Sequence, residues 1–425
     1  MEDTNKVSSE WKEVLLKDIS LGKGEYGIGA SAVEYSDELP TYLRITDIND
    51  DGTLNYTGFK SVDDKNSYKY KLKRNDVVFA RTGNSTGKGY FYEEDDGEFI
   101  YAGFLIKFSL DESKINPNYI GLYIQSKEYK NWINSIVTGS TRKNINAKMY
   151  GEMPIKLPSR NVQDRVVEIG KSINNKIKIN NQMNQTLEEM AQAIFKEWFV
   201  EFNFPITPNF GSSPLDKGEG GKILGYKDNG GEMEESELGE IPEGWRVEEL
   251  GKAFDVTMGQ SPKGSSYNEN RKGSVFYQGR TDFNFRFPSN RIFTTEPKRM
   301  AKQLDVLLSV RAPVGDVNVA TEECCIGRGI AAITSTKTSF LLYTMKNLSQ
   351  KFKMFDNEGT VFGSINKKGL EELKIIVPSD EILNLFEGTV SSIDGFIFNN
   401  SKEIETLINI RDTLLPKLMS GEVRV

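Results

Sequence analysis

The sequence repeats itself at a separation of 220 residues, and this duplication limits the folds that the chain can adopt. The segment 139–159, GSTRKNINAKMYGEMPIKLPS, aligns without a gap with 359–379, GTVFGSINKKGLEELKIIVPS. Identical residues continue at the same offset beyond these segments, as at Leu187 and Leu407. The period far exceeds the roughly 20–50 residues of a solenoid unit. The repeat therefore predicts a tandem duplication of a whole domain together with the segment that follows it.

Each half begins with a globular part of mixed secondary structure. A looser match relates Asp76–Arg81 to Asp305–Arg311 and pairs Arg81 with Arg311. Apolar runs bounded by Gly, Asn and Asp predict strands, and they lie at 76–80, 99–108, 305–310 and 329–334. Apolar residues at helical spacing predict helices at 118–136 and 339–355. Both halves are therefore expected to be α+β.

The segment after each globular part has the heptad pattern of a long helix. Apolar residues and asparagines recur at 4-3-4-3 spacing, which is typical of a helix–helix seam. The predicted seam residues are Ile173, Ile177, Asn180, Leu187, Ile194, Ile393, Ile397, Asn400, Leu407 and Leu414. A helix of about 38 residues spans about 57 Å, which is long for one domain, so the two helices are expected to pack on each other. Two separate helices, each docked on its own domain, remain the alternative.

The residue inventory excludes several kinds of catalytic site. Histidine is absent, which excludes Ser-His-Asp triads and HExxH zinc sites. The only two cysteines, Cys324 and Cys325, are adjacent, so they fit neither a zinc site nor a disulfide framework and are expected to be ordinary strand residues. The segment 83–89 lacks phosphate-loop spacing, and 116–119 lacks the second proline of an Asn-Pro-Pro-Tyr methyltransferase motif. We therefore expect no enzyme activity, no metal and no cofactor.

The net charge of −7 is unevenly distributed along the chain. Residues 211–243 hold nine acidic residues and three lysines, so most of the negative charge lies there and the remainder is near neutral. This distribution allows a basic DNA-binding face but predicts modest DNA affinity for the isolated chain. No apolar run approaches the ~20 residues of a membrane helix, and the N-terminus, MEDTNKVSSEWKEV, is unlike a signal peptide. We expect a cytoplasmic protein without a membrane partner.

Two sequence segments in the second half resemble the specificity subunits of type I restriction–modification systems. They are Glu235–Trp245, ESELGEIPEGW, and Met258–Asn268, MGQSPKGSSYN. The segments Ile375–Ser379 and Leu414–Glu422 are also similar to that family, and the resemblance covers essentially the whole chain. The first half departs from the pattern, because Trp11 lacks a preceding Ile-Pro-Glu-Gly and no Gly-Gln-Ser-Pro follows it.

The resemblance implies two target-recognition domains, each followed by a conserved spacer helix, with the helices packed as an antiparallel coiled coil. The expected parts are target-recognition domain 1 at 10–159, its spacer helix at 160–202, a flexible acidic linker at 203–240, target-recognition domain 2 at 241–379 and a C-terminal spacer helix at 380–421. Each domain is expected to read half of a bipartite, asymmetric site on double-stranded DNA. The implied partners are two methyltransferase subunits and, through them, motor–nuclease subunits that cut DNA using ATP.

Base readout needs Arg, Lys, Asn or Gln on exposed loops, whereas phosphate contacts need positive charge. The predicted DNA-binding residues are Arg81, Lys88, Arg142, Lys143 and Asn144 in the first domain, and Gln260, Lys263, Arg280, Arg286 and Arg311 in the second. The matched Arg81 and Arg311 are expected to have scaffold or phosphate roles, and the unmatched Arg280 and Arg286 to read bases.

The outer faces of the long helices are the expected contact with the methyltransferase. The candidates are Glu188, Glu189, Phe195 and Trp198, although the aromatic pair Trp198 and Phe199 could instead close a local core. Two other functions stay open from the sequence: a free-standing two-domain DNA-binding protein, and an antirestriction or scaffold protein whose coiled coil is the working part.

Overall fold

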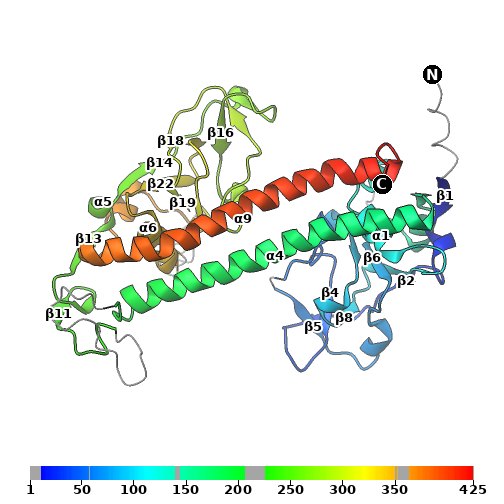
Figure 1. The fold of residues 1–425 in the computed structure, drawn as a ribbon, viewed down its shortest axis with the longest axis horizontal. Coiled ribbons are helices and arrows are strands. Elements are labelled where there is room, and N and C mark those ends of the chain that lie inside the picture. The colour runs from blue at the N-terminus through cyan, green and yellow to red at the C-terminus, as the bar shows by residue number, and fades with distance from the viewer. Residues whose placement is uncertain are drawn as a thin grey trace. The chain divides into compact units, whose positions relative to one another are not determined.

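The protein divides into two compact units. The structure is a computed structural model that describes residues 11–56, 58–138, 144–205, 225–349, 352 and 363–424. Unit 1 consists of Met1–Asn181 and Ser401–Val425, and unit 2 of Gln182–Asn400. The two long helices, α4 (Arg160–Phe199) and α9 (Asp380–Ser420), each contribute one part to each unit (Figure 1).

The described residues of unit 1 form two four-stranded sheets and a separate strand pair. The first sheet has the order β2 (Glu25–Tyr26), β9 (Leu105–Ser109), β6 (Asp76–Ala80) and β7 (Gly89–Phe91). The second has the order β3 (Ala32–Val33), β5 (Lys60–Val62), β4 (Thr41–Leu43) and β8 (Phe99–Tyr101), with β4 and β8 parallel. The strand pair is β1 (Lys12–Leu15) with β10 (Pro154–Leu157). The short helices are α1 (Pro117–Tyr123), α2 (Lys127–Thr138) and α3 (Ala147–Gly151). The 3-10 turns are η2 (Leu16–Ile19), η3 (Ser67–Tyr70), η4 (Gly83–Ser85) and η5 (Glu94–Asp96).

The described residues of unit 2 form a four-stranded sheet, a five-stranded sheet and two strand pairs. The four-stranded sheet has the order β14 (Asp255–Met258), β22 (Ile330–Thr334), β19 (Val306–Ser309) and β20 (Val317–Val319). The five-stranded sheet has the order β15 (Tyr267–Asn268), β17 (Phe293–Thr294), β16 (Ser274–Tyr277), β21 (Cys324–Ile326) and β18 (Met300–Ala301), with β16 and β21 parallel. The strand pairs are β13 (Arg246–Glu249) with β23 (Lys374–Val377), and β11 (Met233–Ser236) with β12 (Gly239–Pro242). The short helices are α5 (Leu250–Ala253), α6 (Thr338–Asn347) and α8 (Lys367–Glu371), and the 3-10 turns are η6 (Gly264–Ser266) and η7 (Arg280–Asp282).

The duplication seen in the sequence is repeated in the topology. The sheet β2-β9-β6-β7 has the same strand order as β14-β22-β19-β20, and both units place one parallel pair in the neighbouring sheet. The pair β1-β10 corresponds to β13-β23. The predicted α+β class is therefore confirmed.

Two apolar cores in each unit share the faces of its central sheet. In unit 1, Val77 and Phe79 of β6 pack into one core, and Val78 and Ala80 pack into the other. This follows from strand geometry, because successive side chains point to opposite faces. Helix α4 enters the first of these cores at Val166.

The two long helices pack antiparallel. In unit 1, Asn180 of α4 donates a hydrogen bond to Glu403 of α9 at 2.8 Å. In unit 2, the Asn400 amide donates to Asn184 at 3.0 Å. Residue numbers fall along α9 as they rise along α4, so the predicted antiparallel arrangement is confirmed. All ten residues predicted for the seam are buried or half-buried.

Several predicted elements differ from the structure. The helix expected at 339–355 is α6, which ends at Asn347, and residues 350, 351 and 353–355 lie outside the described residues. The single helix expected at 118–136 is two helices, because the Ser126 hydroxyl accepts the Tyr129 N–H and starts a second one. The strand expected at 99–108 is broken at 102–104. The linker expected over 203–240 includes β11 and the first two residues of β12, which pair as a hairpin. Cys324 is buried in β21 with its neighbour, as predicted for an ordinary strand residue.

Candidate nucleic-acid interface

Three loops of unit 2 meet at the ends of the strands β14, β16 and β21. The Gln260 N–H donates to the Ile326 carbonyl at 2.9 Å, and the Gly327 N–H donates to the Tyr277 carbonyl at 2.8 Å. A Cβ atom at Gly259 would lie 2.2 Å from the Gly327 oxygen. Glycine at this position therefore lets two backbones approach closely, and the three loops form one surface.

A buried carboxylate shapes the loop after β16. Asp282 is 1% exposed and accepts the Gln278 N–H at 2.7 Å. Its other oxygen accepts a hydrogen bond from Arg291 at 2.6 Å. These contacts fix the turn η7, which carries Arg280 at the surface beside its ion-pair partner Asp316.

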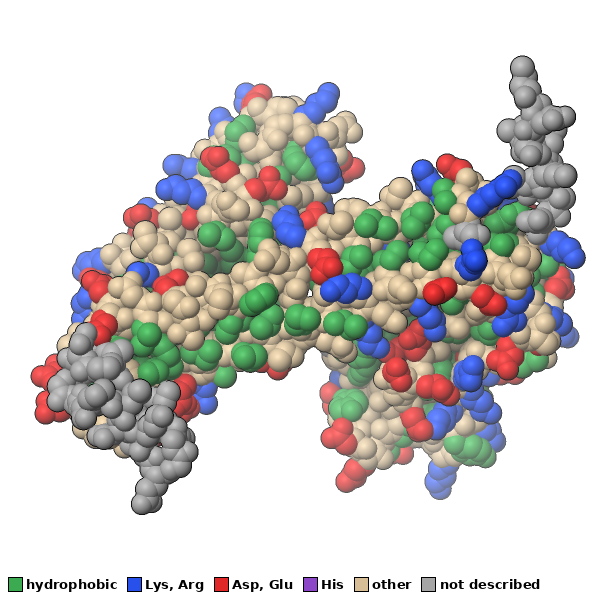
Figure 2. All heavy atoms as spheres, viewed as in Figure 1, with side chains coloured by type: hydrophobic (Ala, Val, Ile, Leu, Met, Phe, Trp, Pro, Cys, Tyr) green, Lys and Arg blue, Asp and Glu red, His purple; other side chains and the backbone are tan. Residues whose placement is uncertain are grey.

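The joined loops present amide and basic side chains to solvent. Among the predicted residues on these loops, Gln260, Lys263 and Arg280 are exposed. Arg311 is also exposed, on the loop after β19, where the Val310 N–H donates to the Gly329 carbonyl at 2.9 Å. The sequence reasoning missed Gln278 and Arg328, which are exposed on the same loops. The Arg328 N–H donates to the Ser261 hydroxyl at 3.3 Å, and the sequence signal for it was an arginine between two glycines after a buried strand. Figure 2 shows Lys and Arg side chains around the part of unit 2 that holds β16 and β18.

Unit 1 has the same loop arrangement with different side chains. A Cβ atom at Gly27, after β2, would lie 2.2 Å from the Ala102 carbonyl oxygen. Asp47 is 2% exposed and accepts the Arg44 N–H at 2.8 Å, as the buried carboxylate of unit 2 does after β16. The Arg44 guanidinium also forms an ion pair with Asp47 at 2.6 Å. The two units therefore share a loop scaffold and differ in what it displays.

Arg81 and Asn144 are neighbours in unit 1. Asn144 is exposed and forms an isolated β-bridge with Thr82. The guanidinium of Arg81 lies 4.9 Å from the centre of the Tyr26 ring, which is a cation–π contact. Arg81 is half-buried, and its Nε atom has no hydrogen-bond partner among the described residues.

The remaining candidates of the first domain are not brought into this group. Lys88 is half-buried and forms an ion pair with Asp50 at 3.2 Å. Arg142 and Lys143 lie outside the described residues.

The predicted match of Arg81 with Arg311 was wrong by one residue. The Arg81 carbonyl accepts the Ile145 N–H at 2.9 Å, and the Val310 carbonyl accepts the Ile365 N–H at 3.1 Å. Arg81 therefore corresponds to Val310. The matched segments have six residues in the first half and seven in the second, and the arginine at the end of each concealed the offset. Because side chains alternate along a strand, the two arginines face different surroundings: Arg311 is exposed, whereas Arg81 is half-buried.

Arg286 does not lie on this surface, and its predicted role in base readout is corrected. The side chain is 3% exposed and forms ion pairs with Glu188 and Asp394. A guanidinium held by two carboxylates in the core does not reach a DNA base. The expectation failed because arginine is usually exposed, and its partners are far away in the sequence.

Three of the four candidates for methyltransferase contact are also buried. Glu188 takes part in the same ion network, and Phe195 and Trp198 are 6% and 7% exposed in the core of unit 2. Phe386 of α9 packs against both rings, with centroids 6.0 and 5.7 Å away. These aromatics close a core, which was the alternative reading, while Glu189 is exposed.

Two motif-like segments have structural roles. Asn116 caps helix α1 by accepting the Asn118 N–H at 3.1 Å. The segment 83–89 contains the turn η4 and joins β6 to β7. Within the described ranges, no helix has the length and apolar character required to cross a membrane.

Comparisons with known proteins relate the chain to one family. A family model described as Type I restriction modification DNA specificity domain matches residues 8–189 and 242–390. A Methanocaldococcus jannaschii protein with the provisional name type I restriction enzyme MjaX specificity subunit is 28% identical, and the match covers 100% of this chain and 96% of that protein. The type I restriction enzyme HindI specificity subunit of Haemophilus influenzae is 24% identical over 98% of this chain and 100% of its own.

A solved structure has the same fold. It is the S subunit of a type I restriction–modification system from M. genitalium, which aligns with a TM-score of 0.56 over 98% of each chain. The sequence identity is 15%, so the likeness concerns the fold alone.

Proposed function

Because this chain belongs to the family of type I restriction–modification DNA specificity domains, we propose that it is the specificity subunit of a type I complex. In this role it recognises a bipartite, asymmetric site on double-stranded DNA and directs methylation and ATP-dependent cleavage by partner subunits. The chain contributes no catalytic group of its own, which fits a sequence without histidine. The complex acts on DNA in the cytoplasm.

The observation that carries this proposal is one loop scaffold displayed twice with different side chains. Unit 1 places Arg44 on the loop after β4, whereas unit 2 places Gln278 on the corresponding loop after β16. On the loop after β21, unit 2 has Arg328 where unit 1 has Gly103 after β8. Arginine pairs best with guanine and glutamine with adenine in the major groove. Different side chains on one scaffold therefore support recognition of two different half-sites.

The long helices supply the spacing between the half-sites in this proposal. We assign 10–159 and 241–379 as the two target-recognition domains, 160–202 and 380–421 as spacer helices, and 203–240 as their connection. Two methyltransferase subunits bind the outer helix faces, and the motor–nuclease subunits join through them. Exposed apolar residues on α4, Ile179 at 51% and Met190 at 49%, support a protein partner on that face.

The test is co-expression of this chain with the methyltransferase encoded beside it, followed by sequencing of methylated DNA. We expect adenine methylation at one split motif and none when this chain is omitted. A stable chain that binds no methyltransferase and adds no methylation would contradict the proposal and favour a free-standing DNA-binding or scaffold protein.

A further inference from the structure

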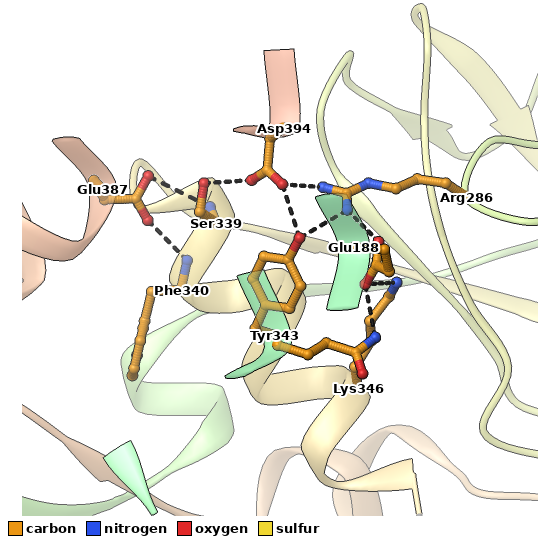
Figure 3. A network of polar contacts seen from close by, with 9 residues as sticks. Glu188, Arg286, Ser339, Phe340, Tyr343, Lys346, Glu387 and Asp394 are labelled. Carbon is orange, nitrogen blue, oxygen red and sulfur yellow. Dashed lines mark hydrogen bonds and ion pairs between the residues drawn. The ribbon is translucent and has the colours of Figure 1, made fainter. Parts of the chain in front are cut away.

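A buried ion network in unit 2 joins a recognition loop to both long helices. The guanidinium of Arg286 forms ion pairs with Glu188 of α4 and Asp394 of α9. It also donates a hydrogen bond to the Tyr343 hydroxyl of α6 at 2.8 Å. Side-chain exposure is 3% for Arg286, 4% for Glu188 and 19% for Asp394. Figure 3 shows how these side chains converge from four parts of the chain.

The charges of the network are balanced. Lys346 of α6 forms a second ion pair with Glu188, so two cations face two carboxylates. Asp394 also accepts hydrogen bonds from Ser339 at 2.6 Å and Tyr343 at 2.9 Å. Burial alone would raise the pKa of Glu188, but Arg286 and Lys346 together lower it below its ordinary value. Glu188 is therefore held as an anion by partners that the fold brings together.

The loop that carries Arg286 also leads to the DNA-reading surface. Its backbone is fixed to β20, because Asn284 exchanges two hydrogen bonds with the Asn318 side chain at 3.1 and 2.9 Å. The Arg286 carbonyl accepts the Val319 N–H at 2.9 Å. Arg280 lies six residues earlier, in the turn η7. The segment 280–286 therefore links Arg280 to the buried guanidinium of Arg286 and is anchored to β20 between them.

The fold does not require this network. Unit 1 has the same topology, but four residues after its buried Asp47 the chain has Asp51 rather than an arginine. In unit 1, Lys178 of α4 forms an ion pair at 3.5 Å with Asp96 of η5, and these side chains are 46% and 11% exposed. Buried ion pairs contribute little net stability and can instead specify one arrangement. The network thus fits a requirement of the second unit alone.

We propose that Arg286 is a positioning residue, which fixes the loop bearing Arg280 to helices α4 and α9 so that the second half-site is read at one spacing from the first. This inference rests on the proposed function. In this proposal, the spacing between the two half-sites depends on the contact of this loop with the helices as well as on the length of the helices. Arg286 itself touches no DNA.

The test uses the double variant R286M/D394N in complex with the methyltransferase. Removing one cation and one carboxylate leaves the Lys346–Glu188 pair balanced, which protects folding better than R286M alone. Methylated sites are then sequenced and sorted by the gap between half-sites. We expect both half-site sequences to persist. Methylation at gaps one base pair longer or shorter should rise, relative to the native gap, by about tenfold or more, the scale of one lost charge-assisted hydrogen bond.

A purely structural role predicts a different result. Destabilised protein would lower methylation equally at every gap, and retention of a single gap by the double variant would overturn the proposal. R160Q is the matched control, because it breaks the pair with Asp164 in unit 1, whose side chains are 51% and 50% exposed. It should change neither the gap nor the rate.

A second variant decides the matter if the double variant is insoluble. R286K keeps the charge but loses the planar fork that reaches two carboxylates at once. We expect it to relax the gap to a smaller extent, and a native gap profile would again overturn the proposal. Absence of methylation by the unmodified complex would instead refute the proposed function, so the two failures are distinguishable.

Discussion

Shortening both long helices by one heptad should shorten the recognised gap. The facing pairs Asn180–Glu403 and Asn184–Asn400 give the register of the two helices. Residues that face each other have numbers that add to about the same value along the seam, so a matched pair of deletions keeps the helices in register.

The deletions of 178–184 from α4 and 399–405 from α9 satisfy this register. They remove both polar pairs together, so no seam residue is left without its partner. Seven residues at ~1.5 Å each shorten the helix by roughly 10 Å, which is about three base pairs at ~3.4 Å per pair. A seven-residue deletion also keeps the heptad phase to within ~20°.

The assay is again sequencing of DNA methylated by the co-expressed complex. We expect unchanged half-site sequences separated by a gap about three base pairs shorter, or no methylation if the rotated half-sites can no longer be reached together. Deletion of 211–217, outside the described residues, removes the same length of chain and should leave the gap unchanged. An unchanged gap after the helix deletions, with methylation intact, would refute the spacing role of the helices.

Three further predictions concern single residues. F386A should lower the free energy of unfolding by about 3–5 kcal/mol, because Phe386 is fully buried with its ring centroid 4.8 Å from that of Phe199; urea unfolding checks this, and a loss below about 1 kcal/mol would contradict it. R328A should weaken binding by about 1–3 kcal/mol and relax one base of the second half-site only, as measured by methylated-site sequencing, whereas an unchanged motif would remove Arg328 from the reading surface. The pKa of Glu188 is lowered in the folded protein, so its ionised form stabilises the fold near neutral pH, and this contribution is lost as the pH falls through the folded-state pKa. The difference in urea midpoint between the unmodified protein and E188Q should therefore shrink in acid. A difference that does not change with pH would count against this role of Glu188.

The architecture could be predicted because it is encoded in local patterns. Apolar runs bounded by turn residues predicted β6 and β19, which are buried along their whole length. The heptad spacing predicted both long helices, because the buried and exposed faces of a helix differ in composition. The repeat then required the two halves to share a topology. Resemblance, rather than periodicity, supplied the antiparallel direction.

The site could be predicted only in part, because exposure depends on contacts between distant residues. Lys263 and Arg311 are exposed as expected, whereas Arg286 is neutralised by Glu188 and Asp394, about a hundred residues away on either side. No local pattern distinguishes a buried arginine with two partners from a solvated one. Arg328 was missed because its loop becomes part of the surface only when β21 lies beside β16.

The last turns of α9 belong to the core of unit 1. Leu415, Leu418 and Met419 are buried beside Leu16 and Ile155. Unit 2 is continuous in sequence, whereas unit 1 needs residues from both ends of the chain. During synthesis the second unit therefore has all its residues before the first, and the part of the protein made earliest is completed last. A stop codon near residue 410 would leave unit 2 complete and would remove core residues of unit 1, although unit 1 begins at the start of the message.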